Sequence, residues 1–252
     1  MTCEEILQIA TRIGLGLLES GAEAYRVENS VHYVVDAYSL GTCQVYSIPN
    51  YLHIALTSSD GQTLSKMSRA SSLKSVDLSR LNALNELCRD IAEYKPEADD
   101  ILDRLKLIDK TPQYSLPKQM LAYAVGSAGF ALFWGGVLSD SIAAALIGCV
   151  VAVIMYYMGR LEANLFYKSI VASAVSAALA LFCVRIGFGC GLSEIIIGVS
   201  MTLLPGLMIT NFMREIIVGD WITGITKLVE ALLIATGIAL GTGMVLSLFG
   251  GI

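Results

Sequence analysis

Apolar residues in the first part of the chain recur at the three- and four-residue spacing that is typical of amphipathic helices. This spacing predicts one helix over residues 4–20 and a second over 23–40. Three short strand candidates follow at 44–48, 51–57 and 62–67, separated by turn residues. The apolar positions that carry the helical spacing are Ile6, Ile9, Ile13, Leu17, Val27, Val31, Val34 and Val35.

Two more helices are predicted after these strands. Asp77 suits the position before a helix, because its side chain can accept a hydrogen bond from a free backbone N–H group. The helix that follows has leucines on one face, and a last short helix is expected over 97–109. Helices that cover a small sheet indicate an α+β domain, which we expect over residues 1–112.

From residue 119 onward the pattern changes to long uncharged runs of about 16–22 residues. A helix needs about 20 apolar residues to cross the hydrocarbon core of a bilayer, and five such runs follow one another. We therefore predict an α-helical integral membrane protein with about five transmembrane helices, over 113–252, behind an N-terminal cytoplasmic α+β domain. The expected spans lie near 119–139, 141–158, 169–187, 193–213 and 228–250.

Charge supports this division and gives an orientation. Residues 1–117 contain 11 of the 17 Lys and Arg and 16 of the 22 Asp and Glu. If this acidic part lies inside the cell, five of the remaining six Lys and Arg flank inner loops, and only Arg185 flanks an outer one. Positive loop residues gather on the cytoplasmic side, so we expect the N-terminus inside and the C-terminus outside. The acidic start also lacks the positive charge of a secretory signal.

Several classes of function are disfavoured by what the sequence lacks. An acidic domain without a basic cluster argues against nucleic acid as a partner. The six cysteines form no C-x-x-C pair and the two histidines lack ligand spacing, so we expect neither a metal nor a cofactor. The chain has no phosphate-binding G-x-x-x-x-G-K-[ST] motif and no hydrolase motif, which favours a protein that is not an enzyme.

The fourth expected span contains Pro205-Gly206, which predicts a broken helix. In transporters such a break exposes the N-terminal end of a half-helix, which attracts anions. An ordinary kink of a membrane helix is the alternative. We expect Pro205, Gly206, Asn211 and Arg214 to bind the carboxylate of a substrate, because arginine holds a carboxylate with two parallel hydrogen bonds.

Ionisable residues follow the break and enter the fifth span. Glu230 is the first candidate for a proton carrier, because a carboxyl group inside the hydrocarbon is costly and its pKa rises on burial. Glu215 and Asp220 are the next candidates. Lys227 lies one helical turn before Glu230 and would oppose that rise. A simple ion pair of Lys227 and Glu230 at the inner membrane surface is the alternative.

The chain resembles the larger subunit of the bacterial threonine/serine exporter family in its split, two-gene form. The resemblance covers nearly the whole chain, with Glu215 standing where members tend to have Asp. It rests on Gly21–Glu28, Arg69, Val76–Leu81, Leu204–Gly206, Asn211, Arg214, Gly219-Asp220, Gly224 and Glu230-Ala231.

The resemblance implies a multi-pass protein of the bacterial cytoplasmic (inner) membrane that forms a hetero-oligomer with a smaller membrane subunit. It also implies export driven by an ion gradient, with protons as the expected ion. Relatives export threonine and serine or C4 dicarboxylates such as succinate, so both kinds of small carboxylate substrate stay open. The alternative from another class is a membrane scaffold or sensor whose cytoplasmic domain binds a partner.

Overall fold

The computed structural model describes residues 1–70, 76–111, 114–161 and 163–249. Contacts within the chain divide it into two compact units. The first consists of Met1–Gln113 and Thr210–Lys227, and the second of Tyr114–Ile209 and Leu228–Ile252. The expected domain boundary falls on 112–113, outside the described residues, and it stays a prediction. The grouping of Thr210–Lys227 with the N-terminal part was not foreseen.

The N-terminal part has the predicted α+β order of elements. Its helices begin with capping groups that the sequence supplies: Thr2 accepts from the Glu5 N–H group at 3.2 Å, and Asp77 accepts from the Arg80 N–H group at 3.0 Å. The expected role of Asp77 as a cap is thereby confirmed. The elements are α1 (Cys3–Glu19), α2 (Ala24–Asp36), β1 (Gly41–Ile48), β2 (Tyr51–Ser58), β3 (Thr63–Arg69), α3 (Leu78–Tyr94) and α4 (Ala98–Lys110).

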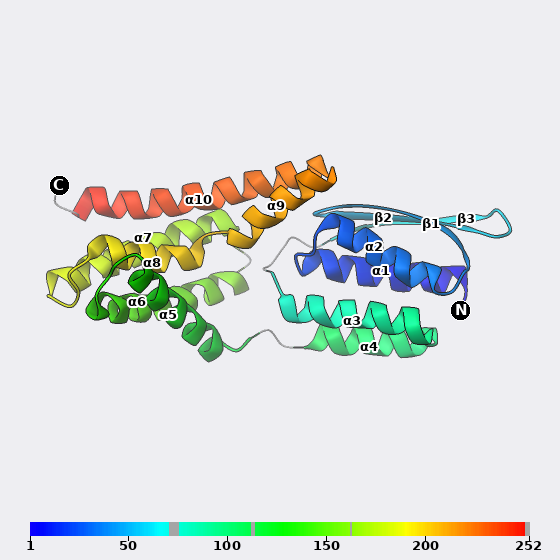
Figure 1. Cartoon of the computed structure of the whole chain (residues 1–252), viewed down its shortest axis with the longest axis horizontal. Helices are drawn as coiled ribbons and strands as arrows, with labels where there is room; N and C mark the ends of the chain where they lie inside the picture. Colours follow the sequence, from blue (N-terminus) through cyan, green and yellow to red (C-terminus); the bar gives the residue numbers. More distant parts are fainter. Residues whose placement is uncertain (71–75, 112–113, 162, 250–252) are drawn as a thin grey trace. The chain divides into compact units, whose positions relative to one another are not determined.

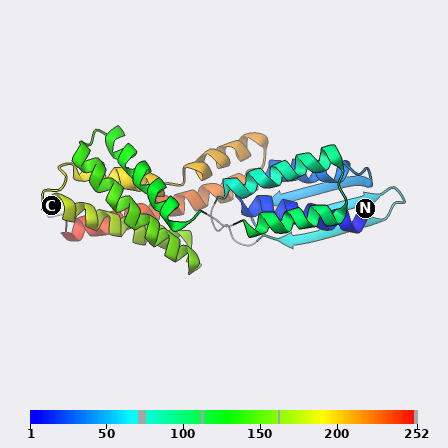
Figure 2. The same cartoon turned by 90° about the horizontal axis from the view of Figure 1, so that it is seen from below.

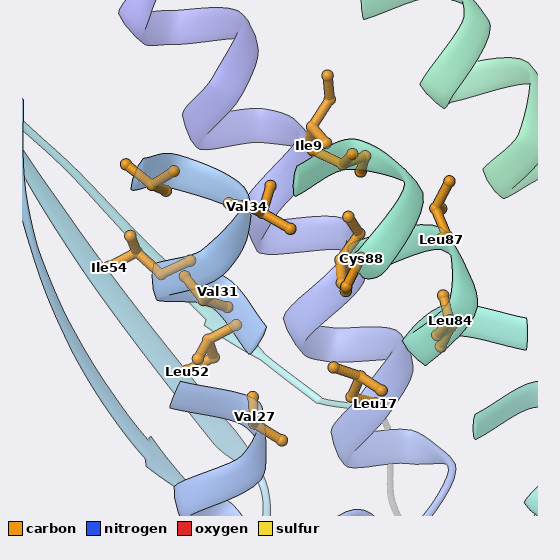
Figure 3. Close-up of a cluster of buried hydrophobic side chains, with 14 of the residues drawn as sticks. Ile9, Leu17, Val27, Val31, Val34, Leu52, Ile54, Leu84, Leu87 and Cys88 are labelled. Atoms are coloured by element: carbon orange, nitrogen blue, oxygen red, sulfur yellow. The ribbon is translucent and has the colours of Figure 1, made fainter. Parts of the chain in front are cut away.

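The three strands form an antiparallel sheet in the order β1-β2-β3, and α1 and α2 cover one of its faces (Figures 1 and 2). Alternate residues of β2 point to these helices and are buried, among them Leu52 and Ile54. Figure 3 shows both beside Val31 of α2, with Leu84 of α3 in the same core. The first part of the chain thus has a hydrophobic core of its own.

The second part of the chain is helical. Its elements are α5 (Leu116–Phe133), α6 (Leu138–Arg160), α7 (Leu165–Arg185) and α8 (Leu192–Leu203), followed by α9 (Gly206–Val218) and α10 (Trp221–Phe249). Among the described residues α6, α7 and α10 are long and apolar enough to cross a membrane. The helices α8 and α9 form a fourth candidate span, bent by 52°. The membrane class of the fold is therefore confirmed.

The helix α5 covers most of the first expected span but is not among these candidates. It has 18 residues, and Lys118 and Gln119 in its first turn lower its hydropathy. The count of five spans therefore stays a prediction, as does the outside position of the C-terminus. The bend between α8 and α9 falls at Leu204-Pro205, where the sequence predicts a broken helix.

Small residues line the contacts between α5, α6 and α8. A Cβ atom added to Gly198 of α8 would lie 2.8 Å from the Ala131 nitrogen of α5, and Gly148 of α6 packs equally tightly on Tyr123 of α5. Backbones approach closely in lipid where glycine and alanine form the interface. The small residues of the predicted spans therefore serve helix packing.

The buried carboxylate of Asp140 links the connection before α6 to the connection before α8. Asp140, in the first turn of α6, is 2% exposed. It accepts hydrogen bonds from the N–H groups of Val137 at 3.0 Å, Cys190 at 2.7 Å and Gly191 at 3.1 Å. Val137 precedes α6 and Gly191 precedes α8. The side chain of Asp140 therefore accepts hydrogen bonds from free N–H groups at the starts of both helices.

Candidate functional site

A tight turn joins α9 to α10 and brings their charged residues together within the first unit. The backbone of Gly219 has φ +106°, a conformation that glycine adopts at little cost. The N–H groups of Gly219 and Asp220 both bond to the carbonyl of Glu215, at 3.1 and 2.9 Å, and so close α9. The chain then reverses into α10, which places Lys227 beside Glu215.

Glu215 lies at the centre of this arrangement and is fully buried. Its Oε1 accepts a hydrogen bond from the Lys227 ammonium at 2.8 Å and another from the Ala24 N–H group at 2.9 Å. Ala24 is the first residue of α2, and the residue before it, Glu23, makes no capping bond of its own. A carboxylate at a helix N-terminus satisfies a free donor and the helix dipole, so Glu215 caps α2 from a distant part of the sequence.

The neighbouring residue on α9 makes a second bond to the same end of α2. Arg214 donates to Glu23 Oε1 at 2.6 Å, while Arg26 lies 3.3 Å from Glu23 Oε2. The side chain of Glu23 is 7% exposed and that of Arg214 is 48% exposed. The Arg214 side chain is therefore about half exposed, whereas its partner Glu23 is buried.

Two further carboxyl groups lie close by. Glu28 of α2 accepts from the Ser47 N–H group at 2.9 Å. Burial raises the pKa of the Glu28 carboxyl, and repulsion from Asp220 adds to the rise against the opposing hydrogen bond. Burial also raises the pKa of Asp220, helped by the charge of Glu215 and opposed by that of Lys227. Both groups thus hold protons more tightly than free carboxyl groups do.

We refer to these seven charged residues as the charge cluster. It consists of Glu23, Arg26, Glu28, Arg214, Glu215, Asp220 and Lys227. A cavity of about 20 Å³, room for about one water molecule, adjoins it and is lined in part by Ala24, Thr223 and Lys227. Among the described residues, no group of His, Cys, Asp and Glu is arranged to hold a metal ion.

The structure brings together four of the predicted site residues and leaves the others on neighbouring segments. Arg214, Glu215, Asp220 and Lys227 belong to the charge cluster. Pro205 and Gly206 form the break before α9, and Asn211 lies on α9 three residues before Arg214. Glu230 lies on α10 within the second unit and is partly buried.

Lys227 makes a contact that the sequence did not predict. Its ammonium lies 2.8 Å from the carboxylate of Glu215, twelve residues earlier. The reason is the reversal at Gly219, which a helical periodicity cannot reveal. The roles proposed from the sequence for Glu230, Glu215 and Asp220 stay predictions.

Glu23 and Glu28 were missed as candidate site residues. They stand in the segment Gly21–Glu28, which the sequence analysis used as a sign of resemblance without giving it a role. The only local signal was a pair of acidic residues at the start of a helix, which is usually a solvated feature. Their partners stand as many as 191 residues away, beyond the reach of any spacing pattern.

Comparisons with known proteins agree with the resemblance seen in the sequence. The model of the threonine/serine exporter family, ThrE, matches residues 8–249. The chain is 24% identical over 242 residues to a protein of Mycobacterium tuberculosis (strain ATCC 25618 / H37Rv) named as a probable threonine/serine exporter, covering 94% of the chain and 45% of that protein. It is also 24% identical over 256 residues to the threonine/serine exporter of Corynebacterium glutamicum, covering 95% of the chain and 50% of that protein.

The chain thus spans about half the length of the curated relatives it matches. No solved structure matches it. Because the family model covers almost all of the sequence, and because the helical region carries candidate membrane spans, the two observations point to one class of protein. The chain belongs to the threonine/serine exporter family.

Proposed function

We propose that this chain is one subunit of a secondary exporter, which moves small carboxylate metabolites out of the bacterial cell in exchange for protons. Membership of the family supports amino acids such as threonine and serine as substrates. The observation that carries the coupling is the buried pair of Glu215 and Lys227, which ties α9 and α10 to the first turn of α2.

The coupling follows from what protonation does to Glu215. The ionised carboxylate accepts hydrogen bonds from the Lys227 ammonium and from the N-terminus of α2. Protonation removes that charge, so the Lys227 ammonium loses its buried counter-ion and the two helices separate more readily. In this proposal proton uptake opens the contact between α2 and α9, and proton release closes it again.

Glu230 keeps a place in this scheme as a relay on the same helix. The 29 residues of α10 extend about 44 Å, which exceeds the ~30 Å of hydrocarbon that a span has to cross. If the far end of the hydrocarbon lies near Phe249, Glu230 stands near its inner edge. A carboxyl group at that depth can take up and release a proton, which is the role proposed for Glu230.

The substrate carboxylate would bind at Arg214, with Asn211 one turn earlier and the Pro205-Gly206 break at the start of α9. The proposal includes a smaller membrane subunit of the same family as the partner. The curated relatives are about twice as long as the region that this chain matches. We place the complex in the cytoplasmic membrane with the N-terminus inside.

Uptake of labelled threonine into inside-out vesicles tests this function. Vesicles from cells that express the chain with its smaller subunit should accumulate threonine when a pH gradient is imposed, and vesicles lacking either subunit should not. We expect Glu215→Gln to abolish accumulation driven by the gradient, whereas Glu86→Gln on the exposed face of α3 leaves it unchanged. Retained gradient-driven transport in Glu215→Gln would move the coupling role to Glu230 or Asp220, and absence of threonine transport by the complete complex would favour a scaffold.

A further inference from the structure

The composition of the charge cluster bears on a choice that the sequence leaves open, between amino acids and dicarboxylates as substrates. The cluster contains four carboxyl groups, of Glu23, Glu28, Glu215 and Asp220. Three cations face them, from Arg26, Arg214 and Lys227. With every group ionised the cluster carries a formal charge of −1.

The charge of the cluster favours amino acids over dicarboxylates as substrates. A dicarboxylate would bring two more negative charges into a partly buried site that already has an excess of carboxyl groups. A zwitterionic amino acid would add none. Coulomb interactions are strong where water is excluded, so this difference weighs heavily against the dianion. Burial raises the pKa of Glu28 and of Asp220, and repulsion from neighbouring carboxylates adds to the rise.

The geometry supplies partners for both ends of a zwitterion. Glu23 and Arg214 lie side by side with opposite charges, 2.6 Å apart, and a zwitterion can insert by exchanging this pair for two new ones. The Arg214 side chain is 48% exposed, and a guanidinium group has five N–H donors, more than the contact with Glu23 uses. The Oε2 atom of Glu215 is buried without a hydrogen-bond donor among the described residues, and an ammonium group would bring three.

We propose that Glu23, assisted by Glu215, receives the ammonium group of the substrate while Arg214 holds its carboxylate, so that the exporter selects zwitterionic amino acids over dicarboxylates. The inference rests on the proposed function and adds Glu23 as a specificity-determining residue. The cavity beside the cluster has a volume of about 20 Å³, and the contact of Glu23 with Arg214 occupies the position proposed for the ligand. The segment Gly21–Glu28 thereby acquires a role in recognition.

Competition against threonine export tests this assignment in the complete complex. The probes are L-threonine, its deamino analogue 3-hydroxybutyrate, and succinate. In the wild type we expect 3-hydroxybutyrate and succinate to compete at least about tenfold more weakly than threonine, the loss that follows from removing one charged hydrogen-bonding partner. Equal competition by succinate would overturn the proposal without any variant.

The variant Glu23→Gln keeps the shape of the side chain and removes its charge. We expect the apparent affinity for threonine to fall by at least about tenfold in this variant. The apparent affinity for 3-hydroxybutyrate should stay within about twofold of its wild-type value. Glu23→Asp should recover part of the affinity for threonine, and Glu86→Gln should change nothing. Equal losses for both compounds, or no loss for either, would show that Glu23 only supports the fold. Failure of the wild-type complex to export any amino acid would instead overturn the proposed function.

Discussion

Glu215 shows how one side chain joins distant parts of this sequence. Its carboxylate neutralises Lys227 and also caps α2, whose own preceding residue leaves that end uncapped. Removing one member of a buried ion pair is costly because the other charge stays behind without a partner. The residue is therefore expected to matter for stability as well as for coupling.

The variant Glu215→Gln should lower the free energy of unfolding by about 3–5 kcal/mol, because the Lys227 ammonium loses its buried counter-ion. The double variant Glu215→Gln with Lys227→Met should recover much of this loss. Chemical denaturation of the purified protein in detergent measures both. Changing the exposed pair Asp103 and Lys106 serves as the control and should cost far less, because solvent screens an exposed ion pair. An equal loss at both pairs would contradict the central place of Glu215.

The carboxyl groups of Glu28 and Asp220 predict a pH dependence of stability. Their pKa values are raised in the folded protein, so between the ordinary carboxyl pKa and the folded one the folded state binds more protons than the unfolded chain. The free energy of unfolding therefore falls as pH rises through this window, and the loss remains at higher pH. Asp220→Asn removes one group and its repulsion on the other.

We expect the melting temperature of Asp220→Asn to fall less than that of the wild type between about pH 4 and pH 7. Asp103→Asn provides a control of opposite sign, because the hydrogen bond from Lys106 lowers the pKa of Asp103 and favours its charged form. If the melting temperatures of Asp220→Asn and the wild type change with pH in the same way, the repulsion between the two carboxyl groups is unimportant.

At the level of helices and strands, local signals in the sequence were sufficient for most of the fold. The alternation of β2, the cap at Asp77 and the break at Pro205 each depend on residues within a few positions of one another. The helix α5 was harder to assign, because Lys118 and Gln119 share a helix with an apolar run. The reversal at Gly219 was missed, since one glycine between two apolar helices carries little information.

Packing of α8 against α5 gives a prediction at this scale. Gly198→Ala places a Cβ atom within 2.8 Å of the Ala131 backbone and the Ser127 carbonyl, which cannot give way as a flexible side chain can. We expect a loss of about 1–3 kcal/mol from overpacking, seen as a lower melting temperature of the protein in detergent. Gly129→Ala on α5, where a Cβ atom meets nothing within 4 Å, is the matched control and should be neutral or stabilising. Equal behaviour of the two variants would exclude close packing at Gly198.

For the whole molecule, the sequence predicted the membrane class, the α+β order of the first part and the family, since long apolar runs and short motifs carry these. The charge cluster was predicted only in part. Arg214, Glu215, Asp220 and Lys227 are near one another in sequence, whereas Glu23 and Glu28 reach them only through folding. No pattern of spacing encodes a contact across so many residues.

The number of spans can be tested with a native residue. Cys190 is exposed in the connection before α8 and stands outside the cell only if α5, α6 and α7 all cross the membrane from an N-terminus inside. We expect an impermeant maleimide to label Cys190 in intact cells, with Cys190→Ser as the control. Labelling only after the cells are permeabilised would mean that α5 does not cross, and the predicted side of the C-terminus would change with it.

The bonds of Asp140 have a consequence for the order in which the protein is made. During translation Asp140 and Val137 emerge together, but the N–H group of Cys190 follows 50 residues later. At about 5–20 residues per second, roughly 3–10 s pass before that donor exists. Throughout this interval the Asp140 carboxylate must stay hydrated. Water therefore cannot be excluded from the end of the α5–α6 hairpin when the hairpin is first synthesised. The last bonds at this end of the helical unit therefore form only once the start of α8 has left the ribosome.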